Sequence, residues 1–417
     1  MNYTKKRWLF LIICCIINFC CGVLYSWSVM AGPLAGRLSE LNNAAYTIGD
    51  LAIVYTFTSA VGPIAMIIGG TINDKKGPKP VFLFAGIMLG LGFILSSMAT
   101  SITMLMIVFG IFVGFGGSFG YGCAVSTATK YFPDKRGLAG GIATAFYGCS
   151  SIVMPVVLLA MNGAMGIATT FLTLGIIYLV VICVTGVFVK KCPPNFRPDG
   201  WTPPAVSANT NTVEDKNWLQ MIKTPIFYIM LVMLLCGAFA GAMVISQASG
   251  IAQNLIKVDM TTASLVVSIL AAFNVIGRLV SGTLSDKIGR VNTLTIAFIF
   301  AFVGGIFFMI CGEGTFALFV AGVACTGIAY GSIMGVFPGF TTDQFGVKNN
   351  SVNYAIMFIG FALAGVVSPI ITKSVYASTG SYMIAFIFCA ALGVLGLLFT
   401  FVYRLYVRGQ KKKAQAA

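Results

Sequence analysis

The residue best suited to bind a ligand is Arg278, a permanent cation inside an apolar segment that runs from about Thr261 to Leu284. An arginine at the centre of a membrane-spanning helix costs roughly 2.5–3.5 kcal/mol, so a compensating contact is expected. Asn274 comes four residues earlier, which places its amide and the guanidinium on the same face of a helix. A guanidinium presents a planar fork of donors that matches a carboxylate, and the apolar segment contains no acidic residue. We therefore predict that Arg278 and Asn274 bind an anion supplied by the substrate.

A purely structural role is the alternative interpretation of Arg278. A long basic side chain can reach the membrane interface, or it can pair with backbone carbonyls and hold a helix bundle together. Arg278 lies more than one turn from either end of its predicted helix, which favours the ligand-binding interpretation.

The composition indicates which elements position this arginine. The chain has 417 residues, of which 58% are hydrophobic and only 9% are charged, and this excludes an ordinary soluble domain. Windows of about twenty apolar residues predict an all-α membrane protein with twelve transmembrane helices. The predicted spans are 8–30, 47–71, 80–99, 103–128, 137–160, 165–189, 224–248, 261–284, 293–311, 315–339, 350–374 and 381–404.

The net charge of +15 follows from membrane topology. With both termini on the cytoplasmic side, the inner loops hold all of the 26 Lys and Arg residues except Arg37, Lys257, Lys373 and Arg278. This is the positive-inside pattern of a multi-pass protein. We expect a monomer in the plasma (inner) membrane, surrounded by lipid and without a nucleic-acid partner.

The residue types argue against an enzyme and against a metal or other cofactor. The chain contains no histidine, and most of its twelve cysteines fall inside predicted spans without a Cys-x-x-Cys spacing. Acid-base or nucleophilic catalysis at membrane depth needs groups that these spans do not offer. Two other classes stay open: a transporter, and a carboxylate sensor built on a transporter scaffold. A measurement of substrate flux distinguishes them.

A short motif occurs twice, 212 residues apart, as Gly-x-x-x-Asp-Lys-x-Gly at 70–77 and at 282–289. Repetition at this distance indicates an internal duplication into two pseudo-symmetric six-helix bundles. We predict an N-terminal bundle over 1–190, a polar, proline-bearing cytoplasmic linker over 191–223, and a C-terminal bundle over 224–417.

The repeated motif resembles the loop motif of the major facilitator superfamily. This resemblance implies the fold of that superfamily. It also implies that the aspartates cap neighbouring helices and latch the cytoplasmic side in the outward-facing state. The predicted latch residues are Asp74, Lys75, Asp286, Lys287 and Arg290.

Further stretches resemble the monocarboxylate transporters and their microbial relatives, the oxalate/formate antiporter family. They are Gly22-x-x-Tyr25-Ser-Trp27, the basic turn at 131–139 and the approach to the seventh helix at 218–225. The resemblance implies a substrate site between the two halves. The remaining residues predicted for it are Tyr25, Tyr121, Tyr147, Tyr330 and Phe361. For each tyrosine, a core or interface position is the open alternative.

Two departures from the family pattern bear on the substrate. Phe361 occupies the position where the oxalate antiporters have a second cation, so an oxalate dianion at Arg278 would leave one charge uncompensated. We therefore favour a monocarboxylate such as L-lactate or pyruvate, with oxalate/formate exchange as the alternative. Asn274 replaces the aspartate of the animal monocarboxylate transporters and cannot titrate. Proton symport is therefore implied by the resemblance alone.

Overall fold

The computed structural model describes residues 3–202 and 215–416, and no strand occurs among them. Part of the predicted linker 191–223 therefore lies outside the described residues. Large apolar side chains stay exposed along the helices, for example Ile64, Val156, Ile276 and Ile387. Such exposure suits contact with lipid, and the predicted all-α membrane fold is confirmed.

The described chain divides into two compact units. Unit 1 comprises 1–131, 146–196 and 350–356, and unit 2 comprises 132–145, 197–349 and 357–417. Both units are therefore discontinuous in sequence, whereas the predicted bundles are continuous. Two short segments, 132–145 and 350–356, each belong to the unit opposite to the one that contains the residues directly after them, and we call them the crossing segments.

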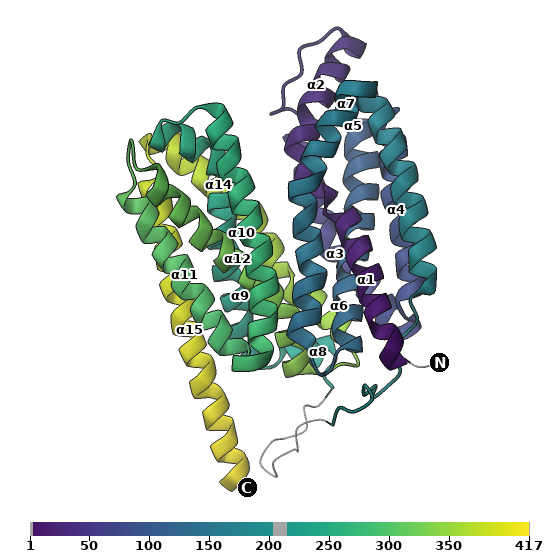
Figure 1. The fold of residues 1–417 in the computed structure, drawn as a ribbon, viewed down its shortest axis with the longest axis vertical. Helices are drawn as coiled ribbons and strands as arrows, with labels where there is room; N and C mark the ends of the chain where they lie inside the picture. Colours follow the sequence, from purple (N-terminus) through teal and green to yellow (C-terminus); the bar gives the residue numbers. More distant parts are fainter. Residues whose placement is uncertain (1–2, 203–214, 417) are drawn as a thin grey trace. The chain divides into compact units, whose positions relative to one another are not determined.

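Helices of the first half of the chain run lengthwise beside one another (Figure 1). They are α1 (Tyr3–Cys21), η1 (Gly22–Ser26), α2 (Trp27–Asn42), α3 (Ala52–Lys76), α4 (Pro78–Ser96), α5 (Ile102–Leu105), η2 (Met106–Val113), α6 (Gly114–Tyr131) and α7 (Arg136–Phe188). The sequence explains the sharp corner between α3 and α4. Gly77 ends α3 with a φ of 91°, a left-handed conformation that suits glycine, and Pro78 follows at the first turn of α4.

Helices of the second half are arranged in the same lengthwise way, and α15 extends past its neighbours toward the C-terminus (Figure 1). They are α8 (Trp218–Ile222), α9 (Pro225–Ile251), η3 (Ala252–Ile256), α10 (Met260–Ile288), α11 (Arg290–Ile310), α12 (Phe316–Phe345), α13 (Asn350–Met357), α14 (Ile359–Thr379) and α15 (Met383–Ala416). Gly289, with a φ of 91°, repeats between α10 and α11 the corner that Gly77 makes in the first half.

Eleven helical stretches of the described chain are long and apolar enough to cross a membrane, and α7 accounts for the difference from the twelve predicted spans. It has 53 residues, which at 1.5 Å per residue is about 80 Å, more than twice the roughly 30 Å of a bilayer core. Gly166 interrupts it with a φ of 76° and a ψ of 162°, which are not helical values. The stretch therefore contains two spans that meet at this glycine.

Candidate functional site

The Arg278 side chain lies in the interior of unit 2, with an exposed fraction of 1%. Its Nε donates a hydrogen bond to Oδ1 of Asn274, one turn earlier on α10, at 3.0 Å. Its Nη1 donates to the backbone carbonyl oxygen of Thr144, in the crossing segment of α7, at 2.6 Å. Both acceptors are neutral oxygens, so these two contacts orient the guanidinium without neutralising its charge. The carbonyl contact is of the kind that the structural interpretation of Arg278 expects.

Glycines let two neighbouring helices approach the α10 backbone at this arginine. A Cβ atom added to Gly335 of α12 would lie 2.5 Å from the carbonyl oxygen of Arg278. One added to Gly141 of α7 would lie 2.6 Å from the same oxygen. A Cβ atom added to Gly331 of α12 would lie still closer to its nearest neighbour, the carbonyl oxygen of Asn274. Since real Cβ atoms are not found so near, any side chain at these three positions would push α10 away from its neighbours.

An aromatic group of the same unit contains two of the predicted site residues. The Tyr330 ring of α12 lies 5.8 Å from the Phe361 ring of α14, and the Phe358 ring lies 4.5 Å from the Phe361 ring at a tilt of 31°, with both distances measured between ring centroids. Tyr330 also packs with Met334 and Ala242 in a small hydrophobic cluster. Phe361 therefore belongs to an apolar aromatic surface.

Unit 1 brings the other predicted tyrosines into one continuous group. The Tyr147 ring of α7 lies 5.1 Å from the ring of Tyr25 in η1 and 4.8 Å from the ring of Tyr121 in α6, and both pairs are edge-to-face. The Tyr121 and Tyr354 hydroxyl oxygens lie 3.2 Å apart, within hydrogen-bond distance. Tyr354 belongs to the crossing segment 350–356 and has an exposed fraction of 1%.

Tyr354 and Thr144 were not among the site residues predicted from the sequence. Tyr354 is a tyrosine inside the predicted span 350–374, like the tyrosines that were predicted for the site, so its residue type was an available signal. Thr144 contacts Arg278 through its backbone carbonyl, which every residue possesses. For that reason no residue type at this position could have indicated the contact.

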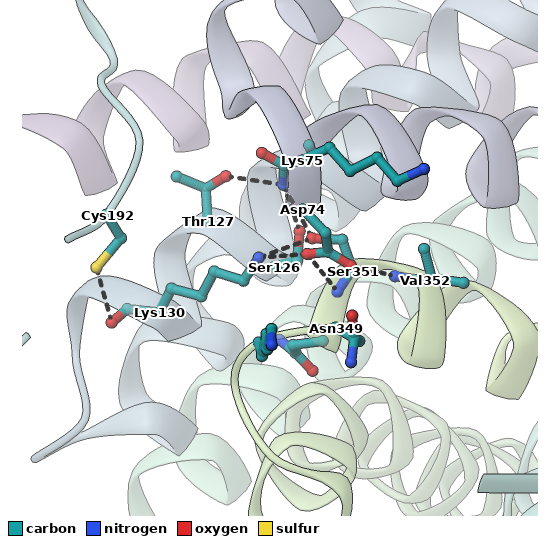
Figure 2. A network of polar contacts seen from close by, with 12 residues as sticks. Asp74, Lys75, Ser126, Thr127, Lys130, Cys192, Asn349, Ser351 and Val352 are labelled. Atoms are coloured by element: carbon teal, nitrogen blue, oxygen red, sulfur yellow. Dashed lines mark hydrogen bonds and ion pairs between the residues drawn. The ribbon is translucent and has the colours of Figure 1, made fainter. Parts of the chain in front are cut away.

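Asp74, from the first copy of the repeated motif, caps the crossing segment of α13 (Figure 2). Its carboxylate accepts hydrogen bonds from the backbone N–H groups of Ser351 at 3.2 Å and Val352 at 3.1 Å. Lys130 of α6 forms an ion pair with the same carboxylate at 2.5 Å, and both side chains are largely buried. These contacts satisfy N–H groups that the first turn of a helix leaves without internal partners.

Asn73 extends this polar network within unit 1. Its amide nitrogen lies within hydrogen-bond distance of Oγ of Ser126, Oγ1 of Thr127 and Oγ of Ser351. Lys130 also donates to Oγ of Ser351, at 3.1 Å. The crossing segment is thus held to α3 and α6 by side chains as well as by the cap.

Asp286, from the second copy of the motif, caps the crossing segment of α7 in the same manner. Its two carboxylate oxygens accept hydrogen bonds from the N–H groups of Gly137 and Leu138, both at 2.8 Å. Arg290 donates to Asp286 at 2.7 Å and to Asp343 of α12 at 2.8 Å. Arg136 of the crossing segment itself also pairs with Asp343, at 2.7 Å.

The two caps obtain their cations differently. Asp74 is paired with Lys130 of α6, which is distant in sequence, whereas Asp286 is paired with Arg290, which follows it by four residues at the start of α11. The predicted latch lysines, Lys75 and Lys287, are exposed, and neither side chain forms an ion pair with another described residue. The contacts made by the two copies therefore centre on Asp74, Asp286 and Arg290.

These features define a membrane transporter built from two repeats, and comparison with known proteins identifies its family. The Major Facilitator Superfamily profile matches residues 8–346 and 256–417. The chain belongs to the major facilitator superfamily, whose members are transporters rather than enzymes.

Relatives at modest identity agree with this assignment. The chain is 30% identical over 367 residues to the uncharacterized transporter YhjX of Escherichia coli, covering 88% of this chain and 87% of YhjX. It is 29% identical over 366 residues to the oxalate:formate antiporter of Oxalobacter formigenes, covering 87% and 83%. It is 28% identical over 382 residues to the probable nitrate transporter NarT of Staphylococcus carnosus, covering 89% and 90%.

Among solved structures, the fucose:proton symporter FucP of Escherichia coli has a similar fold. The TM-score is 0.68 at 14% sequence identity, and the match covers 97% of this chain and 99% of FucP. This similarity concerns the fold alone. The predicted major facilitator fold and the resemblance to the oxalate/formate antiporters are thus both confirmed.

Proposed function

We propose that this transporter carries a small monocarboxylate, such as L-lactate or pyruvate, by alternating access, with Arg278 as the residue that binds the carboxylate. The observation that carries the proposal is a guanidinium with 1% exposure that Asn274 and the Thr144 carbonyl, on two different elements, hold in one orientation in the interior of unit 2. A buried cation gains most from an ionised partner that it can bind through two parallel hydrogen bonds. A carboxylate supplies such a partner and leaves again with the substrate.

The surroundings of Phe361 support a monoanion over a dianion. Its ring packs against Phe358 and Tyr330, so an apolar aromatic surface occurs where the oxalate antiporters have a second cation. One arginine and one carboxylate form a neutral pair. A second carboxylate would enter a poorly hydrated site uncompensated, at a cost of several kcal/mol.

Oxalate/formate exchange is the second candidate, because a relative of that name is 29% identical over most of the chain. The probable nitrate transporter among the relatives is named for another small anion with a single charge. A single arginine as the anion-binding residue agrees with such a substrate. A carboxylate sensor on the same scaffold remains the alternative outside transport, and measured flux would exclude it.

Proton symport is part of the proposal through family likeness only. Oδ1 of Asn274 accepts the Nε–H of Arg278, a contact that an amide makes at any physiological pH. A coupling proton would therefore have to travel on the substrate carboxylate, on water or on a tyrosine. Location in the plasma membrane, cytoplasmic termini and a monomeric state belong to the same proposal.

For the conformational change, we propose that the crossing segments act as the latch. Asp74 and Asp286 each hold one of them at its first turn, as the resemblance to the superfamily implies. Alternating access requires these contacts to be made and broken in each transport cycle.

The proposal is tested by measuring uptake into proteoliposomes that contain the purified protein. L-lactate, pyruvate, formate, oxalate and nitrate are supplied in turn, with and without an inward proton gradient. We expect saturable uptake of L-lactate or pyruvate that oxalate does not inhibit. Uptake of oxalate that requires formate inside the vesicles would instead establish the second candidate.

A further inference from the structure

One face of α10 contacts the crossing segment of α7 at three successive levels. Asp286 accepts hydrogen bonds from the N–H groups of Gly137 and Leu138 at the start of the segment. One turn back along α10, Gly282 lies against Gly137, where an added Cβ would be 2.4 Å from the Gly137 carbonyl oxygen. One further turn back, Arg278 donates to the carbonyl oxygen of Thr144.

Residues 278, 282 and 286 are four apart, so they lie one above another on a single helix face. The predicted carboxylate-binding residue and the predicted latch residue therefore contact the same segment, at its two ends. Thr144 is fully buried, and its Oγ1 donates to the carbonyl oxygen of Gly141 at 3.1 Å.

We propose that Thr144 is a positioning residue for substrate: its carbonyl oxygen fixes the plane of the Arg278 guanidinium, so carboxylate affinity depends on whether the crossing segment 132–145 is docked on α10. This inference rests on the proposed role of Arg278 in carboxylate binding. The proposed substrate site would then include the Thr144 carbonyl and the crossing segment of α7 in addition to the side chains already assigned to it.

Carboxylate binding depends on the orientation of the guanidinium. A bidentate carboxylate contact needs the guanidinium plane in one orientation, and two acceptors on two different elements, Asn274 Oδ1 and Thr144 O, impose it. If the segment undocks, one acceptor leaves and the long side chain regains rotamers, which weakens carboxylate binding. By thermodynamic linkage, bound carboxylate must then stabilise the docked segment by the same factor.

The first test uses the wild-type protein and amide hydrogen exchange read by mass spectrometry. We expect saturating L-lactate to slow exchange in peptides that cover 137–145 by about tenfold, the effect of one buried hydrogen bond to a charged group. Peptides that cover 350–356, the other crossing segment, should change much less. L-lactamide, which has the same shape without the charge, should have no effect.

The second test uses a matched pair of substitutions on α7. In Gly141→Ala, the new Cβ would meet the Arg278 carbonyl oxygen at 2.6 Å and force the segment away from α10. Gly163→Ala makes the same change where nothing lies within 4 Å. We expect the Kd for L-lactate to rise about tenfold or more in Gly141→Ala and to stay unchanged in Gly163→Ala.

The possible outcomes separate this inference from the proposed function. If the wild-type protein binds none of L-lactate, pyruvate, formate and oxalate, the proposed function fails, and with it the inference. If the wild type binds L-lactate but exchange at 137–145 is unchanged or faster, the inference alone is overturned. The same holds if Gly141→Ala binds with the wild-type Kd. Because the exchange test needs no variant, misfolding of Gly141→Ala leaves the inference testable.

Discussion

Asp74 and Asp286 occupy the same position in the two copies of the repeated motif, and each carboxylate accepts hydrogen bonds from two backbone N–H groups at the start of a crossing segment. The duplication therefore preserves a function of the carboxylate rather than the identity of its cation. Lys130 supplies that cation in one copy and Arg290 in the other.

Removing a cap should weaken the hold on its crossing segment. In Asp286→Ala, the Gly137 and Leu138 N–H groups lose their acceptor, and loss of a helix cap typically costs about 1 kcal/mol. We expect a lower thermal unfolding temperature and a reduced rate of lactate uptake. Lys287→Ala, which changes the adjacent exposed residue, serves as the control, and equal effects of the two substitutions would contradict the assigned role of Asp286.

The pair formed by Asp74 and Lys130 is more buried than the second cap, so breaking it should be more costly. Lys130→Met removes the cation and leaves a largely buried carboxylate without it, for which about 3–5 kcal/mol of destabilisation is typical. Lys79→Met, at an exposed position, is the matched control. Measured yield and thermal stability of both variants test this, and a Lys130→Met protein as stable as its control would argue against the ion pair.

The hydroxyl pair of Tyr121 and Tyr354 should behave as one unit. Each single change to Phe removes one partner of a contact of 3.2 Å, so Tyr121→Phe and Tyr354→Phe should impair uptake to similar degrees. The double variant should be only slightly worse than either, with a coupling energy of about 1 kcal/mol in a double-mutant cycle. Additive effects would mean that the two hydroxyls act independently.

The charge of the side chain at position 361 should determine whether the transporter prefers a monocarboxylate or a dicarboxylate. Phe361→Lys introduces a second cation beside Tyr330 and Phe358, and we expect uptake of oxalate to rise while uptake of L-lactate falls. Phe361→Leu, which keeps the position apolar, should retain the preference for lactate. Competition assays with both anions measure the ratio. An unchanged ratio in Phe361→Lys would remove this residue from the account of specificity.

Much of the fold followed from the sequence because membrane spans depend on local composition. The helix from Met260 to Ile288 contains the predicted span 261–284, and the corner at Gly77 and Pro78 was marked by the motif itself. Gly166, which divides α7, lies next to the predicted start of the sixth span at 165.

The parts of the site that the sequence did not reveal depend on tertiary packing. The crossing segments have no distinctive composition that sets them apart from the residues next to them in the chain. Only the contacts of the folded chain define them. The Thr144 contact uses a backbone carbonyl, and the close approach of Gly141 and Gly335 to Arg278 involves helices far apart in sequence. Asn274, by contrast, was found because its contact with Arg278 is local to one helix.

The central claim is that the Arg278 guanidinium binds the substrate carboxylate, and its most direct test is uptake of radiolabelled L-lactate by proteoliposomes containing Arg278→Ala. The variant should insert and fold, because it removes a buried charge, while Arg278→Lys should retain a measurable part of the activity. We predict that Arg278→Ala abolishes saturable uptake at a protein level equal to wild type. Uptake by Arg278→Ala with the wild-type KM and kcat would contradict the account.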